Sequence, residues 1–542
     1  MHWAFKIAEE VIAKRPNLPL YVVASGITPS GSIHIGNYRE FITNYYVAKA
    51  LHMMGKKVKM IFSWDDFDRF RKVPKNITVA GFERYLGLPV ADVPNPFVGT
   101  SADVFKSETF AKHFQNEFET VMQEFGNNEI PVEFIYQNKK YRSGVYNKAI
   151  IEALGKRKQI YDIIASFKTQ EESAEEREVY YPVSVYCSSC GKDFTEVLGY
   201  DDKKAILEYR CKAGEAHGCK TDGAVQKVDV KAANNVKLVW KVDWPMRWRH
   251  ENVVFEAAGI DHHSENGSFA VGRRIAKEIF GIDAPETCVY AWVGIKGVST
   301  ANMSSSSGVN ITPRQLLNVY EPQIIRWLFA KYDHKDSFDF GFDDMVSRHY
   351  IEFDRNLKNY FAGTLQDYER VYMNLALFAK PETYADRCGF STLATLAPIA
   401  SFNEAKTKAL VERAGEKFNK GRFEKVKYWL ENHMPEKNYA TRTQFNKEFF
   451  ATLNAEEKAV VTELAKFLAS GAKGKAKTEL QIQEHLYSII NKVELTKKEN
   501  LQRQQRFFKI FYNLLFGRDD GPRLYLYLAS VDLGQALQLL KS

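Results

Sequence analysis

Short apolar runs separated by amphipathic stretches organise the first part of the chain. Residues 20–24 and 58–64 are apolar runs typical of buried strands, and residues 38–54 between them have helical periodicity. A strand, helix, strand unit of this kind predicts a parallel pair, with the loop after the first strand at the carboxyl ends. The alternation continues with a predicted strand at 130–135 and a predicted helix at 146–155.

The pattern changes twice further along the chain. A charged run ending at Glu178 leads into a cysteine-bearing, β-rich segment, after which residues 253–255, 268–280 and 288–292 return to strand, helix, strand character. Beyond Pro313 the segments are long and amphipathic, without clear strand alternation. They predict helices at 314–331, 401–420, 456–468 and 481–491. The sequence therefore predicts an α/β fold: a Rossmann-type parallel sheet with a β-rich insertion, followed by an all-α C-terminal bundle.

The length of 542 residues exceeds what one hydrophobic core organises, so several domains are expected. We expect the first half of the parallel-sheet domain at 1–170, the insertion at 171–234, the second half at 235–312, a helical connecting domain at 313–400 and a basic helical domain at 401–542.

Charge is informative mainly through its location. The chain has 75 Lys and Arg against 67 Asp and Glu, and residues 401–542 hold 25 against 17, which is the whole surplus. This basic tail fits either an ordinary solvated surface or a polyanion-binding face. Aromatic residues interleaved with the basic ones at 503–512 suit RNA bases, and they equally suit a helix core stripe. No apolar stretch long enough to span a membrane and no secretory leader is evident, so we expect a cytoplasmic protein without membrane association.

The turn at residues 25–37 carries the first candidate chemistry. Glycines 26, 31 and 36 let a ligand approach the backbone, and His34 and Asn37 stand three residues apart at a helix start. Because a helix N-terminus after a buried strand favours anions, this turn predicts a nucleotide phosphate site. The alternative is an ordinary small-residue turn with a capping histidine.

Four cysteines lie in the insertion: Cys187, Cys190, Cys211 and Cys219. Paired cysteines in a cytosolic chain favour metal over disulfide, and tetrahedral sulfur ligation predicts structural Zn²⁺. His217 is a rival to Cys219 as a ligand, and reduced or redox-active thiols are the alternatives.

A second small, polar loop at 301–308 follows the last predicted strand of the interrupted sheet. Its composition fits a flexible linker. Its position also allows it to fold over the nucleotide predicted at residues 25–37.

These motifs together resemble a known family. Residues 29–37, Pro-Ser-Gly-Ser-Ile-His-Ile-Gly-Asn, resemble the first signature of class I aminoacyl-tRNA synthetases, and residues 302–306, Asn-Met-Ser-Ser-Ser, resemble a degenerate form of the second, Lys-Met-Ser-Lys-Ser. Within that class the chain is most similar to the class I lysyl-tRNA synthetases, through residues 24–31, 62–69, 239–248 and 320–329 as well.

The resemblance implies ATP-dependent attachment of L-lysine to tRNA(Lys) through a lysyl-adenylate, with Mg²⁺ and without an obligate protein partner. It implies catalytic roles for His34, Asn37, Ser304, Ser305 and Ser306. The implied ATP-binding residues are Pro29, Ser30, Gly31, His34, Gly36, Asn37, Asn302 and Met303, and the implied lysine-binding residues are Gly26, Thr28, Trp240, His262 and Tyr290.

The chain departs from the family at Asn302, where the signature has lysine. Lys296, Arg273 or Arg274 are candidate replacements for the missing cation. A synthetase for glutamate or another amino acid is one alternative function, because Arg247 and Arg249 suit an acidic substrate. A catalytically weak tRNA- or RNA-binding paralogue is another.

The tryptophan-rich segment at 239–248 is interpreted as a strand. Strand alternation places Trp240, Trp244 and Trp248 on one face, with Asp243 pointing away from them. Asp243 is therefore expected to be a weak partner for a substrate ammonium, and an aromatic core is the alternative role for the tryptophans.

Overall fold

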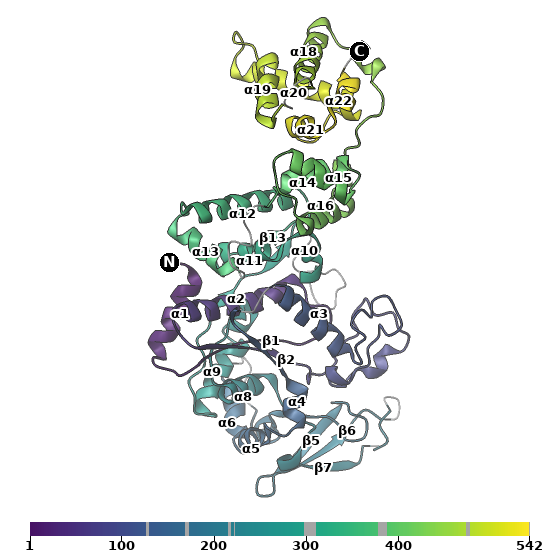
Figure 1. Ribbon diagram of the computed structural model, residues 1–542. Coiled ribbons are helices and arrows are strands. Elements are labelled where there is room, and N and C mark those ends of the chain that lie inside the picture. Colours follow the sequence, from purple (N-terminus) through teal and green to yellow (C-terminus); the bar gives the residue numbers. More distant parts are fainter. Residues whose placement is uncertain are drawn as a thin grey trace. The chain divides into compact units, whose positions relative to one another are not determined.

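A four-stranded parallel sheet forms the centre of the first part of the chain (Figure 1). The computed structural model describes residues 1–125, 129–167, 173–214, 218–221, 223–297, 311–377, 387–472 and 477–540. The sheet has the order β3-β2-β1-β9, with β1 at Tyr21–Ile27, β2 at Val58–Trp64, β3 at Val132–Tyr136 and β9 at Val253–Phe255. Tyr21 lies opposite Val58 and Ile27 opposite Trp64, which confirms the predicted parallel pair.

Helices cover both faces of this sheet. On one face, Phe62 of β2 packs between Phe41 of α2 (Ile35–Met53) and Phe118 of α3 (Phe110–Glu124), with ring centroids 6.0 and 5.3 Å away. On the other face, Ile61 shares a buried cluster with Trp244 of α8 (Trp240–Glu251) and with residues of α9 (Ser268–Glu278). Figure 1 shows these two helix pairs on opposite sides of β1 and β2.

The tryptophan-rich segment is helix α8, so its interpretation as a strand is wrong. Trp240 and Trp244 stack with centroids 5.1 Å apart, and Trp244 and Trp248 follow at 5.0 Å. A spacing of four places side chains on one face of a helix as well as of a strand. Pro245 lies within α8.

The insertion contains an antiparallel sheet of β5 (Thr195–Asp201), β6 (Ile206–Cys211) and β7 (Val225–Asp229). It is bracketed by β4 (Val183–Val185) and β8 (Val236–Leu238), which pair antiparallel to each other. The preceding helices are α4 (Gln137–Arg142), α5 (Asn147–Gly155), α6 (Arg157–Ala165) and α7 (Ala174–Glu178).

Smaller elements complete this part of the chain. They are α1 (Trp3–Lys14), the parallel pair β10 (Ala258–Gly259) and β11 (Val289–Tyr290), the parallel pair β12 (Val293–Ile295) and β13 (Phe338–Phe340), and α13 (Asp367–Ala376). β13 is a strand beyond Pro313, where no strand was predicted. The strand is short, and its two phenylalanines alternate with one aspartate over only three positions, too few to give a recognisable pattern.

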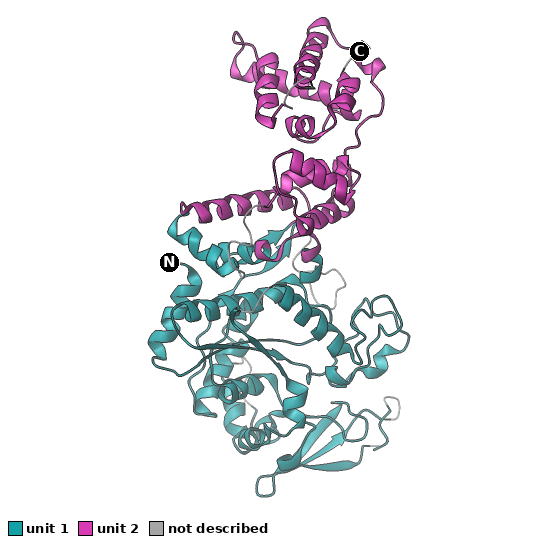
Figure 2. Cartoon of the chain, viewed as in Figure 1, with its two compact units in different colours: residues 1–316, 325–340, 365–378 teal, residues 317–324, 341–364, 379–542 magenta. Residues whose placement is uncertain are grey.

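The chain divides into two compact units (Figure 2). Unit 1 comprises residues 1–316, 325–340 and 365–378, and unit 2 comprises 317–324, 341–364 and 379–542. Helices of unit 2 are α12 (Met345–Ala362), α14 (Phe390–Ile399), α15 (Glu404–Arg413), α16 (Lys420–Asn432), α17 (Lys447–Ala451), α18 (Ala455–Ala472), α19 (Glu479–Ile490), α20 (Lys497–Phe516), α21 (Leu524–Ser530) and α22 (Leu533–Leu540).

Two predicted helices are interrupted. Residues 314–331 form α10 (Pro313–Val319) and α11 (Pro322–Lys331), because Pro322 starts a new helix. The segment 401–420 contains α15, which is followed by Gly415 with a φ of 83°, and ends at Lys420, the first residue of α16.

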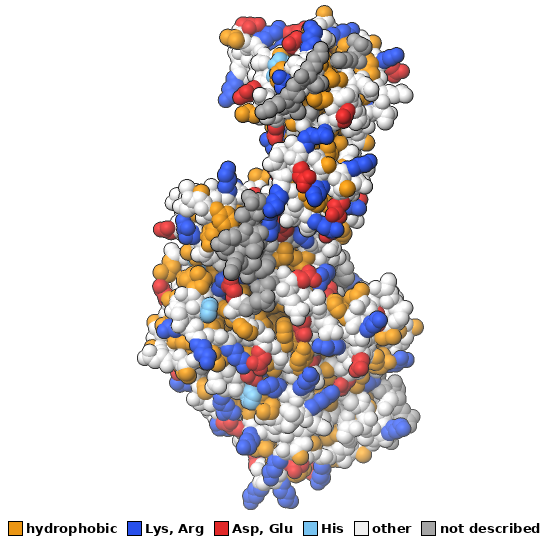
Figure 3. All heavy atoms as spheres, in the orientation of Figure 1, with side chains coloured by type: hydrophobic (Ala, Val, Ile, Leu, Met, Phe, Trp, Pro, Cys, Tyr) orange, Lys and Arg blue, Asp and Glu red, His pale blue; other side chains and the backbone are white. Residues whose placement is uncertain are grey.

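No helix among the described ranges is both long and apolar enough to cross a membrane. On the face drawn in Figure 3, Lys and Arg side chains are interspersed with Asp and Glu side chains on both units.

Candidate active site

A cavity of about 350 Å³ lies at the carboxyl ends of β1 and β2. β1 continues into it through Gly26 and Thr28, and α8 contributes Trp240, Trp244 and Arg247. The remaining lining residues include Ser30, Asn37, Glu40, Ser63, Asp65, Asp68, Glu256 and His262. The cavity thus joins an aromatic wall to several carboxylates.

Most of the predicted lysine-binding residues meet at this cavity. Gly26, Thr28, Trp240 and His262 line it. Tyr290 is not among the lining residues, but its hydroxyl donates to Oε2 of the lining residue Glu40 at 3.1 Å. Of the predicted ATP-binding residues, Ser30 and Asn37 also line the cavity.

His34 lies at the start of α2, next to this cavity. Its side chain is buried, and burial lowers its pKa to about 4, so the imidazole is neutral at pH 7. Its Nδ1 has no hydrogen-bond partner in the described part of the chain. A Cβ at Gly36 would lie 2.9 Å from the His34 ring, so glycine is needed there to accommodate the imidazole.

The predicted second signature, Asn302 to Ser306, and the rival metal ligand His217 lie outside the described residues. The chain on either side of the second signature reaches the His34 turn. The Ile311 carbonyl accepts from the backbone N–H of Ile35 at 2.9 Å, and the Val293 carbonyl lies 3.8 Å from a Cβ built at Gly36. Both flanks of the second loop therefore lie beside the first.

The candidate replacement arginines lie away from the cavity lining. Arg274 pairs with Glu278 at 2.7 Å along α9, and the guanidinium of Arg273 lies over the Phe269 ring at 5.5 Å. Lys296 immediately follows β12. The first residue of this strand is Val293, whose carbonyl oxygen lies beside Gly36.

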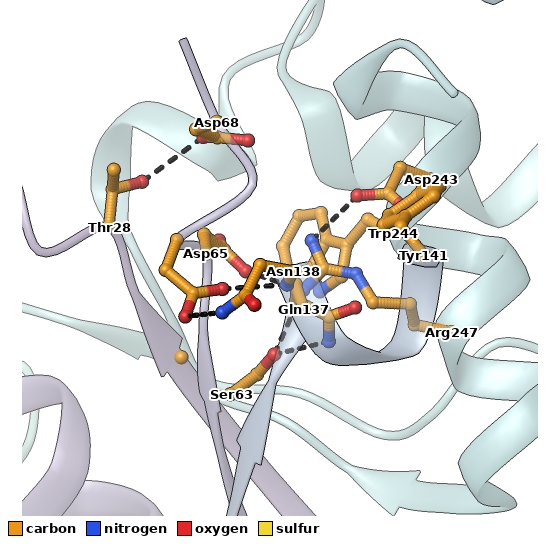
Figure 4. A network of polar contacts seen from close by, with 12 residues as sticks. Thr28, Ser63, Asp65, Asp68, Gln137, Asn138, Tyr141, Asp243, Trp244 and Arg247 are labelled. Atoms are coloured by element: carbon orange, nitrogen blue, oxygen red, sulfur yellow. Dashed lines mark hydrogen bonds and ion pairs between the residues drawn. The ribbon is translucent and has the colours of Figure 1, made fainter. Parts of the chain in front are cut away.

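Arg247 is the centre of a buried polar network (Figure 4). Its guanidinium donates to Asp65 at 2.5 Å, to Ser63 Oγ at 3.0 Å and to Asp243 at 2.9 Å. The Tyr141 hydroxyl donates to the other oxygen of Asp243. Asp243 is fully buried in this network and does not line the cavity, so it is unsuited to a substrate ammonium, as expected, although the strand argument for it was wrong.

Asp68 is also neutralised within the protein. Lys237 forms an ion pair with it, and Thr28 Oγ1 donates to it at 3.2 Å. Burial raises the pKa of Asp68, but the Lys237 ammonium more than offsets this, so the pKa lies below its usual value.

Glu40 faces the cavity without a cationic partner among the described residues. Its Oε1 accepts from the Gly26 backbone N–H at 3.1 Å and from Ser25 Oγ at 3.3 Å, and its Oε2 accepts from Tyr290. Burial raises its pKa to about 8, although the Gly26 hydrogen bond opposes the shift. A buried carboxylate held by neutral donors is a strong site for a ligand cation.

Glu256 is a second carboxylate of this kind. Its Oε2 accepts from the indole N–H of Trp244 at 3.0 Å and of Trp248 at 2.7 Å, and burial raises its pKa to about 7. Glu40 and Glu256 thus give the cavity two carboxyl groups that are poised to titrate near neutral pH.

Sequence reasoning missed these acidic residues, although each has a positional signal. Asp65 follows β2 and Glu256 follows β9, and the carboxyl ends of parallel strands meet at one edge. Glu40 stands four residues after Gly36, on the same face of α2.

The four predicted cysteine ligands come together in the insertion. Their sulfur atoms all lie within 4.8 Å of one another, with Cys187 and Cys219 at 3.9 Å and Cys190 and Cys211 at 3.8 Å. This cluster could hold a metal ion.

A parallel sheet with a turn such as that at His34 and a cavity at the carboxyl ends of its strands is the arrangement typical of nucleotide-binding α/β proteins. Residues 1–376 match the family described as tRNA synthetases class I (K), and the chain belongs to that family.

Relatives extend the similarity over the whole chain. A lysine–tRNA ligase of Treponema pallidum is 31% identical over 539 residues, which cover 97% of this chain and 95% of that protein. Lysine–tRNA ligases of Pyrococcus horikoshii, 31% identical over 100% of this chain and 99% of that protein, and of Thermococcus kodakarensis, 33% identical over 98% of each, are similar to the same extent.

Proposed function

We propose that the protein attaches L-lysine to tRNA(Lys) in the cytoplasm, using ATP and passing through a lysyl-adenylate. The observation that carries this proposal is the similarity, over nearly the full length, to proteins named lysine–tRNA ligase. The cavity supports it, because an aromatic wall suits the methylenes of lysine and a carboxylate suits its ammonium.

Lysine binds with its side-chain ammonium at Glu40. The carboxylate is fixed by Gly26, Ser25 and Tyr290, so it accepts the ammonium without reorganising. Trp240 and His262 enclose the aliphatic part of the substrate, and Gly26 and Thr28 form the floor from β1.

The same geometry disfavours glutamate. A synthetase for an acidic amino acid needs a cation that is free to bind the substrate carboxylate. Arg247 faces the cavity, but its guanidinium is already held by Asp65 and Asp243. Lys237 is likewise held by Asp68.

The reaction has two steps. The lysine carboxylate attacks the α-phosphorus of ATP, pyrophosphate leaves, and the terminal ribose hydroxyl of the tRNA then takes the acyl group from the adenylate. Catalysis of this kind rests on positioning and charge stabilisation. Neutral His34 and Asn37 donate hydrogen bonds to phosphate or ribose oxygens, with Pro29, Ser30, Gly31 and Gly36 shaping the turn.

The loop from Asn302 to Ser306 supplies further hydroxyl and backbone donors through its three serines, while Asn302 and Met303 contact the nucleotide. Mg²⁺ bound to the ATP phosphates supplies charge neutralisation there. Asn302 cannot supply the cation of the family signature. This departure, together with the basic tail at 401–542, favours a catalytically weak tRNA- or RNA-binding paralogue as the alternative.

The cysteine cluster holds structural Zn²⁺. Four sulfurs bonded at about 2.3 Å in a tetrahedron lie about 3.8 Å apart, close to the two sulfur separations of 3.8 and 3.9 Å. With all four positions filled by protein sulfur, such a site stabilises the insertion and has no place for a substrate. Elemental analysis of the purified protein should find one zinc per chain, and a folded insertion without metal would contradict the assignment.

The basic residues of 401–542 recognise tRNA, in a helical domain distinct from the parallel-sheet segments 1–170 and 235–312, the insertion 171–234 and the connecting segment 313–400. The surplus of 25 Lys and Arg against 17 Asp and Glu supports this assignment.

Pyrophosphate exchange into ATP, measured with tRNA present, tests the adenylation step. Lysine should drive exchange, while glutamate and arginine should not. His34→Ala should lower the rate by about 10²–10³-fold, because it removes a donor to the reacting nucleotide, and should leave the unfolding temperature close to that of the parent. Exchange driven by glutamate would support the rival synthetase, and tRNA binding without any exchange would support the weak paralogue.

A further inference from the structure

Glu256 is held in place by hydrogen bonds to its side chain and to the backbone around it. Its backbone N–H donates to the Glu286 carbonyl at 3.0 Å, and the next N–H, of Ala257, donates to Asn44 Oδ1 at 2.8 Å. The indoles of Trp244 and Trp248 both donate to its Oε2. Four groups from three segments therefore hold this residue at the edge of the cavity: two hold the backbone at Glu256 and Ala257, and two hold the carboxyl group.

The other carboxylate oxygen of Glu256, Oε1, does not accept from these indoles. No hydrogen bond to Oε1 is present within the described ranges, and Glu256 lines the cavity. The residue is 8% exposed, and Oε1 is not among the fully enclosed atoms that lack a partner, so this oxygen is open to the cavity. An oxygen at a cavity wall without a donor from the protein is free to accept a hydrogen bond from a ligand or to hold a proton of its own.

The charged groups around it do not meet this need. Arg247 lowers the pKa of Glu256 from a distance, but its hydrogen bonds go to Asp65, Ser63 and Asp243. Burial lowers the pKa of His262, which keeps this imidazole neutral at pH 7. Asp68 is paired with Lys237.

The remaining acidic neighbours are Asp65, whose charge raises the pKa of both glutamates although Asp65 is paired with Arg247, and Glu40, whose negative charge repels that of Glu256. Ionisation of Glu256 raises the pKa of Glu40, and both carboxyls already have pKa values raised by burial, to about 8 for Glu40 and about 7 for Glu256. Two carboxyl groups with this mutual effect retain a proton between them near neutral pH.

We propose that Glu256 is a second specificity-determining carboxylate of the amino-acid site, and that Glu40 and Glu256 exchange one retained proton for the side-chain ammonium of the substrate. This inference rests on the proposed function, since it takes lysine as the ligand. The balance is simple: the singly protonated pair carries one negative charge, lysine brings one positive side-chain charge, and the complex holds the doubly ionised pair with the ammonium while one proton leaves to solvent.

This exchange provides selectivity that one carboxylate does not. A neutral side chain of similar length leaves the pair protonated and gains no ion pair. A lysine side chain gains hydrogen bonds to two charged groups, each of which contributes more than a neutral hydrogen bond.

Calorimetric titration of the full chain with L-lysine measures the proton count directly. Titrations at pH 7 in two buffers with different ionisation enthalpies should give a release of roughly one proton per lysine bound. Glu256→Gln should bind lysine about 10–100-fold more weakly and release clearly fewer protons, because one titrating group is lost and the pKa of Glu40 falls. Glu278→Gln, which removes an exposed carboxylate of α9 paired with Arg274, should match the parent.

L-norleucine, which has the α-ammonium and a similar side chain without the second ammonium, separates the two ends of the substrate. It should bind weakly and without proton release. Release with norleucine would assign Glu256 to the α-ammonium and overturn the proposal, and this arm needs no variant that could fail to fold.

The outcomes also separate this inference from the proposed function. Lysine binding without proton release, or release unchanged in a folded Glu256→Gln protein, overturns the inference and leaves lysine as the substrate. Binding of another amino acid in place of lysine overturns both. Thermal unfolding of each variant shows whether it is folded.

Discussion

At the scale of single residues, the chemistry of the cavity depends on which carboxylates have a cation beside them. Asp65 and Asp243 share Arg247, and Asp68 has Lys237. Glu40 and Glu256 accept only neutral donors. Since burial without a cation raises the pKa of a carboxyl group, these two glutamates are the ones prepared for a cationic substrate.

Glu40→Gln should weaken lysine binding more than any change outside the cavity. The variant keeps the shape and the acceptor oxygen but removes the charge that faces the ammonium, which costs about 10–100-fold in affinity. Equilibrium binding of L-lysine measures this, with Glu278→Gln as the matched control. Parent-like affinity in Glu40→Gln would show that the ammonium binds elsewhere.

The same two glutamates should make the ligand-free protein less stable as the pH rises. Their pKa values in the folded protein, about 8 and about 7, exceed the usual glutamate value of 4.5. Between pH 4.5 and those values, the native state therefore holds protons that the unfolded state has released. This contribution to stability is fully present below about pH 4.5 and is lost as the pH rises through 7 and 8. Unfolding temperatures at about pH 6 and pH 8.5 should therefore differ less in Glu40→Gln than in the parent, and an equal or larger difference would contradict the assigned protonation.

At the scale of elements, the packing of α8 against α9 sets the position of the tryptophans. Gly272 of α9 lies against Trp248, and a Cβ at this glycine would meet the Trp248 ring at 3.2 Å. Because the ring is enclosed by Trp244 and Phe269, it has little room to yield.

Gly272→Ala should therefore destabilise the protein by about 1–3 kcal/mol through overpacking. Gly155→Ala is the matched control: this glycine also lies in a helix, and a Cβ there has no neighbour within 4 Å. The control should be neutral or slightly stabilising, because alanine favours helix over glycine. Chemical denaturation measures both, and equal stability of the two variants would contradict the packing described.

The elements that follow from local pattern were predictable, and those that depend on tertiary contacts were not. β2 occupies the predicted positions because its seven residues, of which only Lys59 and Ser63 are polar, are consistent with a buried parallel strand. α8 was misassigned because a four-residue spacing fits the period of a helix as well as that of a strand. The tertiary packing of the tryptophans decides between helix and strand. In the site, glycine and histidine positions followed from the turn, whereas Glu256 required knowing which strand ends meet, and Glu40 required knowing which face of α2 lines the cavity.

At the scale of the whole molecule, each unit has its own core and its own expected role. Unit 2 contains a buried cluster built from α18 to α22, including Leu464, Leu486, Phe511 and Leu514. Phe507, Phe511 and Leu514 of α20 are buried there, so the aromatic stripe of this helix serves the core. On the same helix, the basic side chains of Lys497, Lys498, Arg506 and Lys509 are exposed.

Affinity for tRNA should fall steeply as salt rises, because phosphate contacts release counterions. Lys497 and Lys498, both exposed at the start of α20, are candidates for such contacts. Replacing both by glutamate should lower the affinity and the slope of its salt dependence, whereas Lys6→Glu on α1 should change neither. Binding to purified tRNA at several salt concentrations tests this, and an unchanged slope in the double variant would remove these lysines from the interface.

The most direct test of the account is a charging assay of the full chain, with total tRNA, ATP and Mg²⁺, against a panel of single labelled amino acids. The account predicts that L-lysine alone is transferred to tRNA at a substantial rate and that Glu40→Gln loses this transfer at low lysine concentration. Transfer of glutamate or another amino acid in preference to lysine, or no transfer of any amino acid by a protein that binds tRNA, would contradict it.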